Sequence, residues 1–239
     1  LSRGLGDVYK RQVFDASSGV NHDWLERFMD SAGFVSEEQV QQMWGKVLAK
    51  EFEKPGSTPH NMVRILSEIT SKHAEAFQKI CSMKRLSVFT DGNGSVKAVR
   101  SDIVVPYEGN EAEFRALGLS FDLLNELETL GLIKFNSIAG FVALNTPEKG
   151  VVTYIDGLTQ EVESHKKDQL PIGNVMLTEA GDCLCRIIQP TPIPNYISLE
   201  KKYMISNGVV FKERPGYLIL DNGKGQLSLH RTPEPATEK

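Results

Sequence analysis

Residues 36–52, SEEQVQQMWGKVLAKEF, contain the clearest amphipathic pattern of the chain. Apolar residues recur at the i, i+3, i+4 and i+7 spacing of one helix face, which predicts a helix that buries this face against its neighbours. Ser36 and Gln39 have the spacing of a capping box, and Val35 with Val40 that of a hydrophobic staple. The predicted buried stripe consists of Val40, Met43, Trp44, Val47, Leu48 and Phe52.

The centre of this stripe is Trp44, which is predicted to anchor the core or, alternatively, to belong to a self-association face. The neighbouring Gly45 costs roughly 1 kcal/mol relative to alanine inside a helix. Close approach of another helix would offset this cost, so tight packing is expected at Gly45. The apolar stripe offers no group for catalysis, and the segment therefore indicates packing rather than chemistry.

Three further helices are predicted around this stretch. One is capped by Asp23 with Glu26, the next has Thr58 as its N-cap with Pro59 at N1, and a fourth begins near Thr70. Their short connections favour antiparallel packing in a bundle. The expected core residues of these helices are Trp24, Phe28, Ala32, Met62, Ile65, Leu66, Ile69, Ala74, Phe77 and Cys81.

The pattern changes after this bundle. Two strand-like runs in residues 86–105 flank the turn residues 91–94, which is typical of a hairpin. Residues 108–190 then have the order helix, helix, two or three strands and closing helix, as in a winged-helix domain with a wing enlarged over roughly residues 140–173. Ser120 and Thr178 are the expected N-caps of its second and closing helices, and Gly131 ends the second.

A linker with three prolines, residues 190–194, leads to a short helix marked by Tyr196, Leu199 and Tyr203 and to three short strands. The predicted class is therefore α+β, mostly helical. Residues 20–105 are expected to form the bundle and hairpin, 108–190 the winged-helix-like domain, 194–230 a small C-terminal α/β piece, and 231–239 a disordered tail.

The first twelve residues, LSRGLGDVYKRQ, resemble a translated sequencing adapter and are left out of the fold reasoning. Without them the 27 basic and 31 acidic residues become 24 and 30, a net charge of −6. Because no initiator Met is present, we expect the chain to start inside a gene whose upstream region is missing. The acidity disfavours binding of nucleic acid backbone. Three cysteines in apolar contexts predict a reducing, cytoplasmic location, and no residue run is long and apolar enough to span a membrane.

Residues 23–80 resemble a bacterial family of uncharacterised proteins, domain of unknown function family 2806. The resemblance is carried by the helix with Trp24 and Phe28, by QMWGK at 42–46 and by Pro55–Ser57, and the later passages LETLGLI and LTEAGDCL are similar too. It covers about residues 20–210 and implies no established activity. After Ser57 the family tends to continue with a basic helix start, whereas this chain has residues TPHN, which argues against an anion site there.

Motifs for metal, cofactor or catalytic sites are absent or incomplete, so none is predicted. The calcium-like loop that starts at Asp91 has Val96 where the sharp turn needs glycine. Cys183 and Cys185 are some 200° apart around a helix and are expected to be core or semi-exposed thiols. The five histidines form no metal-binding pair, and no nucleophile elbow or phosphate-binding loop occurs. The histidines are His22, His60, His73, His165 and His230.

A DNA-reading helix at residues 120–130 should expose Arg, Lys, Asn or Gln, but this one offers Asp122, Asn125, Glu126 and Glu128. Basic pairs occur at Lys84–Arg85, Lys166–Lys167 and Lys201–Lys202, the second of them on the wing, and are expected to be solvated surface. Our leading hypothesis is a non-enzymatic protein-interaction or regulatory module, with a protein partner or self-association. The alternatives are nucleic-acid binding through the winged-helix-like domain, and an enzyme or effector whose active part lies in the missing N-terminal region.

Overall fold

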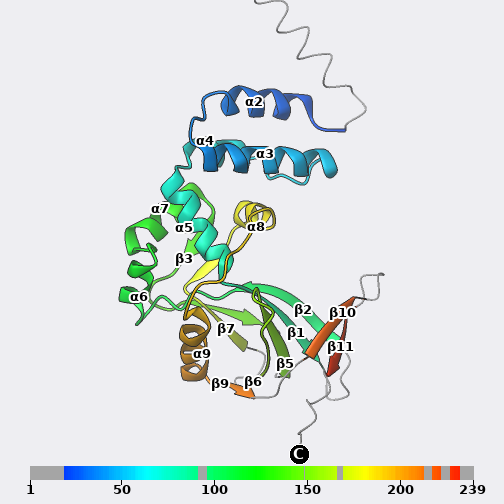
Figure 1. Cartoon of the computed structure of the whole chain (residues 1–239), viewed down its shortest axis with the longest axis vertical. Coiled ribbons are helices and arrows are strands. Elements are labelled where there is room, and N and C mark those ends of the chain that lie inside the picture. The colour runs from blue at the N-terminus through cyan, green and yellow to red at the C-terminus, as the bar shows by residue number, and fades with distance from the viewer. Residues whose placement is uncertain are drawn as a thin grey trace, which may run out of the picture.

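The computed structural model describes residues 19–90, 96–147, 149–165, 169–212, 217–221 and 227–231. Their eight helices and eleven strands confirm the α+β class, although the strands are more numerous than predicted. Helices α2, α3 and α4 lie at one end of the molecule, and the largest sheet lies at the other with α9 beside it (Figure 1). The helices are α2 (His22–Ala32), α3 (Glu38–Glu53), α4 (Met62–Glu68), α5 (Ser71–Ser82), α6 (Glu111–Ala116), α7 (Phe121–Leu130), α8 (Glu179–Cys185) and α9 (Tyr196–Ser206).

The strands form one five-stranded antiparallel sheet in the order β2-β1-β5-β6-β9 and the two-stranded pairs β3-β8, β4-β7 and β10-β11. The predicted hairpin is confirmed as β1 and β2, with Val88 opposite Val99, while its turn lies outside the described residues. The strands are β1 (Lys84–Thr90), β2 (Val96–Ile103), β3 (Ile133–Phe135), β4 (Phe141–Leu144), β5 (Lys149–Tyr154), β6 (Thr159–Ser164), β7 (Gln169–Gly173), β8 (Val175–Leu177), β9 (Val209–Lys212), β10 (Tyr217–Asp221) and β11 (Leu227–Arg231).

Helices α2 and α3 lie one above the other, and α5 runs from this layer toward the sheet (Figure 1). Trp44 is 3% exposed, its ring meets Phe28 edge-on at a centroid distance of 4.5 Å, and its Nε1 donates to the carbonyl of Leu66 at 3.2 Å. The prediction that Trp44 anchors the core is therefore confirmed. The expectation of tight packing at Gly45 is wrong, because a side chain there would meet no atom within 4 Å.

The predicted starts of α3 and α2 are wrong. α3 begins at Glu38 and has no side-chain capping bond, so the Ser36–Gln39 box does not form. The N-cap of α2 is Asn21 rather than Asp23, with its Oδ1 accepting from the N–H of Trp24 at 3.0 Å.

The start of α4 also differs, because a buried carboxylate organises the turn before it. Asn61 rather than Thr58 is the N-cap of α4. Glu51, which is 4% exposed, accepts hydrogen bonds from the N–H groups of Gly56 and Thr58, the latter at 2.9 Å. α4 therefore starts at Met62 and not at Pro59, the predicted first residue of the helix.

The caps of α7 and α8 are as predicted. The hydroxyl oxygens of Ser120 and Thr178 accept from the third N–H group of each helix, and Gly131 ends α7 in the left-handed conformation with φ +89°. β3 pairs with β8, with Ile133 opposite Leu177, so the segment after α7 and the segment before α8 lie side by side. The winged-helix assignment and the domain boundaries stay predictions.

Two hydrophobic cores hold these elements. The larger one joins α2–α5 with α6–α8, from Trp24 to Tyr196, and the smaller one lies among the sheet, β4, β7 and α9. Gly150 of β5 makes room for the ring of Phe89, since a Cβ there would lie 2.6 Å from that ring. β6 and β7 lie in the stretch expected to be the enlarged wing. The short helix marked by Tyr196 is confirmed as α9, which buries Tyr196, Glu200 and Met204.

Candidate interaction surface

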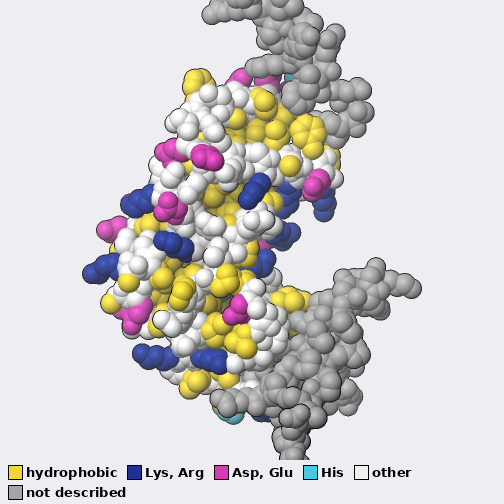
Figure 2. All heavy atoms as spheres, in the orientation of Figure 1, with side chains coloured by type: hydrophobic (Ala, Val, Ile, Leu, Met, Phe, Trp, Pro, Cys, Tyr) yellow, Lys and Arg dark blue, Asp and Glu magenta, His cyan; other side chains and the backbone are white. Residues whose placement is uncertain are grey.

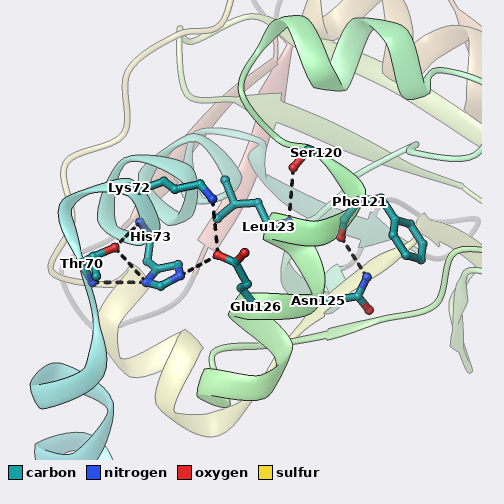
Figure 3. Close-up of polar contacts among 8 residues, drawn as sticks. All are labelled: Thr70, Lys72, His73, Ser120, Phe121, Leu123, Asn125 and Glu126. Atoms are coloured by element: carbon teal, nitrogen blue, oxygen red, sulfur yellow. Dashed lines mark hydrogen bonds and ion pairs between the residues drawn. The ribbon is translucent and has the colours of Figure 1, made fainter.

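The polar face of α7 is the first candidate, because a winged-helix arrangement would place this helix against DNA. Asn125 donates from its Nδ2 to the carbonyl of Phe121 at 2.9 Å, within the same helix (Figure 3). Glu128 accepts from the N–H of Phe135 at 3.2 Å and so fixes the start of β3. Both side chains thus have hydrogen-bond partners within the fold.

Glu126 of α7 contacts two residues of α5. Its Oε2 lies 2.9 Å from Nε2 of His73 and 3.5 Å from Nζ of Lys72 (Figure 3). The N–H of Thr70 donates to Nδ1 of His73 at 3.2 Å, so a neutral imidazole carries its proton on Nε2, directed at the carboxylate. The hydrogen bond from His73 lowers the pKa of Glu126. A carboxylate that would repel phosphates thus holds α7 against α5.

The basic pairs do not form one patch. Arg85 is 1% exposed and pairs with Glu200, so the expectation of a surface pair is wrong for Arg85. Lys201 lies over an aromatic ring of β9, with Nζ 5.7 Å from the ring centroid. On the face shown in Figure 2, Lys and Arg side chains occur in separate groups among acidic and apolar ones. Lys166 and Lys167 lie outside the described residues.

Arg85 and Glu200 are the centre of a buried polar cluster that the sequence analysis missed. Burial raises the pKa of both neighbouring phenols, Tyr154 and Tyr196, so they stay protonated at neutral pH. The hydroxyl of Tyr196 donates a hydrogen bond to the carbonyl of Val104 at 2.8 Å. The adjoining cavity measures about 20 Å³, which is room for about one water rather than a substrate. We therefore assign the cluster a structural role.

The three cysteines are free and buried, which confirms Cys183 and Cys185 as core thiols. Burial, together with a hydrogen bond to Cys185, holds the pKa of the Cys81 thiol well above its usual range. The same hydrogen bond lowers the pKa of Cys185. Because thiolates are the reactive form, Cys81 is a poor nucleophile.

The described residues bring no three His, Cys, Asp or Glu side chains together in a way that would hold a metal ion. His73 is the histidine that pairs with a carboxylate, and His22, His60 and His165 are exposed and lie apart in the chain. The calcium-like loop, residues 91–95, and the side chain of His230 lie outside the described part.

Phe34 lies in the turn between α2 and α3 and, at 90% exposure, is the most exposed large apolar side chain of the described residues. The backbone around it is nevertheless held by hydrogen bonds. Phe34 N–H donates to the carbonyl of Ser31 at 3.3 Å, and Val35 N–H to that of Ala32 at 3.2 Å. Nε2 of Gln41 adds a 2.8 Å bond to the carbonyl of Val35. The ring is thus presented to solvent by a turn of defined conformation.

A hollow of about 300 Å³ adjoins Phe34. Its polar edge is formed mainly by serine hydroxyls and Glu37, whose carboxylate also caps the start of α5 at Ser71. Phe34 and this hollow together are called the Phe34 surface below. The apolar residues that line it are Phe34, Val35, Val40, Leu66 and Ile69.

The sequence model of a family described as "Protein of unknown function (DUF2806)" matches residues 11–200. The chain belongs to this family. No curated protein and no solved structure matches this DUF2806 chain. Within its described residues, no helix has the length and apolar character that crossing a bilayer requires.

Proposed function

We propose that this DUF2806 chain is a protein-interaction module that docks a partner protein through the Phe34 surface. The observation that carries the proposal is the exposure of Phe34 on a hydrogen-bonded turn. Burying a phenylalanine side chain stabilises a structure by about 1.5–3 kcal/mol, and the free chain forgoes this gain. A partner that covers the ring would recover it, and aromatic residues are enriched at the centres of protein interfaces.

The surroundings of Phe34 support the same proposal. The apolar part of the hollow beside the ring offers a place for a side chain of the partner, and its serine and glutamate edge offers hydrogen bonds at the rim. Interfaces of this kind combine an apolar centre with a polar rim. A non-enzymatic role is supported by two ionisable pairs, Arg85 with Glu200 and His73 with Glu126, whose members are engaged with each other. The free cysteines support a cytoplasmic location.

The proposal is tested by photo-crosslinking in the source cells, with p-benzoylphenylalanine in place of Phe34 of the intact chain. Phe121 on α7, which is 49% exposed, provides the control position. We expect a discrete covalent adduct from position 34 and none of the same mass from position 121, and mass spectrometry distinguishes a second copy from another protein. The absence of an adduct from position 34, or identical adducts from both positions, would refute the proposal.

A further inference from the structure

A second hollow, of about 450 Å³, lies between α3, α5 and the segment after α8. Its floor is apolar and buried, formed by Met43, Ala74 and Ile188. Its rim consists of exposed polar side chains from the same elements, and four of these six are glutamines. The rim residues of this glutamine groove are Glu38, Gln39, Gln42, Lys46, Gln78 and Gln189.

The chemistry of the rim matches that of a peptide main chain. A glutamine carboxamide has an N–H donor and a C=O acceptor, the same two groups that each peptide unit presents. The groove already makes such a contact within the chain, since Nε2 of Gln78 donates to the main-chain carbonyl of Gln189 at 3.2 Å. Carboxamides therefore stand on three sides of the groove, on α3, on α5 and after α8.

The charges of the groove disfavour ionic ligands. Glu38 and Lys46 carry opposite charges and stand eight residues apart on α3, about 12 Å along the helix axis. An anionic ligand is therefore attracted by Lys46 and repelled by Glu38, and a cationic ligand experiences the reverse. In both cases the electrostatic attraction at one end of the groove is offset by repulsion at the other. The lining contains no aromatic residue, so it lacks the stacking platform on which proteins hold nucleobases.

We propose that the glutamine groove binds an extended, uncharged polypeptide segment of the partner. The main chain of this segment pairs with the carboxamides of the rim, and one apolar side chain covers Met43, Ala74 and Ile188. A volume of about 450 Å³ is within the ordinary range of sites that enclose small ligands, which suits a few residues of peptide. This inference rests on the proposed interaction function and specifies the form in which the partner is bound.

The binding test uses ¹³C-methyl methionine NMR on the full chain with three capped tripeptides. Met43, on the groove floor, reports binding, and Met29 on α2, which is 36% exposed and outside the groove, is the internal control. Acetyl-Ala-Leu-Ala-amide should shift the Met43 methyl signal saturably and leave Met29 unmoved. The analogues with Asp or Lys in place of both alanines should bind more weakly. No saturable Met43 shift, or tighter binding of either charged peptide, would overturn the inference.

Rim variants test the role assigned to the carboxamides. Gln42→Ala with Gln78→Ala should weaken binding of the uncharged peptide about tenfold, the loss expected for one or two hydrogen bonds. Gln169→Ala, which changes an exposed glutamine of β7 outside the groove, should leave it unchanged. Unchanged binding in the double variant would refute main-chain recognition. Phe34→Ser should abolish the photo-crosslinked partner's binding without moving the Met43 shift, so failure of the groove and failure of the Phe34 surface are distinguishable.

Discussion

Arg85 of β1 and Glu200 of α9 form an ion pair whose two side chains are both 0% exposed. The pair joins the five-stranded sheet to a helix that lies 115 positions later in the chain. Glu200 occupies the middle of the buried stripe of α9, between Tyr196 and Met204. The attachment of α9 therefore depends on a charge that has its partner in another element.

Replacing one member of this pair should be more damaging than replacing both. Glu200→Met leaves the Arg85 guanidinium buried without its counter-charge, and we expect a loss of about 3–5 kcal/mol in the free energy of unfolding. The double variant Arg85→Met, Glu200→Met should lose less, because apolar side chains of similar size can fill the site. Urea denaturation of the unmodified chain, Glu200→Met and the double variant measures their free energies of unfolding and checks this order of stability. A double variant that is less stable than Glu200→Met would contradict it.

The same pair shows where prediction from sequence ends. The helices α2–α5 are predictable because each carries an apolar stripe that has only one way to be buried. Arg85 stands next to Lys84, and a basic pair is ordinarily solvent-exposed. The signal against this was the alternation in β1, which places Arg85 on the same side as Ser87 and Phe89. Its partner, Glu200, is too far along the chain for any local pattern to reveal.

The missed strands and caps have a different cause. β6 reads TQEVES, which has one apolar residue, so its strand conformation depends on pairing with β5 and β9 rather than on its own pattern. Ser36 is a good N-cap by type, yet the N-cap of α3 is Glu37, one residue later, and no side chain caps this helix. The Phe34 surface could be predicted only as a loop, because exposure of a single ring follows from the packing of α2, α3 and α4 around it.

Two helical glycines should respond oppositely to alanine. Gly45→Ala adds a methyl group in open space within α3 and should stabilise the protein by about 1 kcal/mol. Gly181→Ala in α8 would place its Cβ 1.9 Å from the carbonyl oxygen of Leu132 and should destabilise it by several kcal/mol. Thermal unfolding of both variants against the unmodified chain measures the two shifts. Stability changes of the same sign would contradict either the open space at Gly45 or the close contact of Gly181 with Leu132.

The carboxylate of Glu51 should be needed for the turn between α3 and α4. Glu51→Ala removes the acceptor for the N–H groups of Gly56 and Thr58 and should cost about 1–3 kcal/mol of stability. Glu53→Ala, two residues later and exposed, is the matched control and should stay within about 0.5 kcal/mol. Amide hydrogen exchange gives a local readout, because the protection of Thr58 should fall in the first variant only. Equal losses in both variants would argue against the capping role.

The contact of His73 with Glu126 should make the attachment of α7 to α5 depend on pH. The pKa of Glu126 lies below its ordinary value of 4.5, chiefly through the hydrogen bond from His73. A carboxylate whose pKa is lowered by folding stabilises the folded state at pH values above its pKa in the unfolded chain. This contribution is lost as the pH falls through its pKa in the folded protein. At neutral pH the free energy of unfolding should therefore be larger for the unmodified chain than for Glu126→Gln. In acid the two free energies should converge.

NMR titration of the Glu126 carboxyl carbon separates the causes of this shift. In His73→Ala its pKa should rise toward 4.5, whereas Lys72→Ala should move it less, because the hydrogen bond from His73 is the larger cause. Circular dichroism verifies that α5 keeps its helix after losing the Thr70–His73 capping box. A larger shift in Lys72→Ala than in His73→Ala would show that charge rather than the directed hydrogen bond holds Glu126. The two helices would then tolerate any cation at this position, and His73→Lys would preserve the pKa of Glu126.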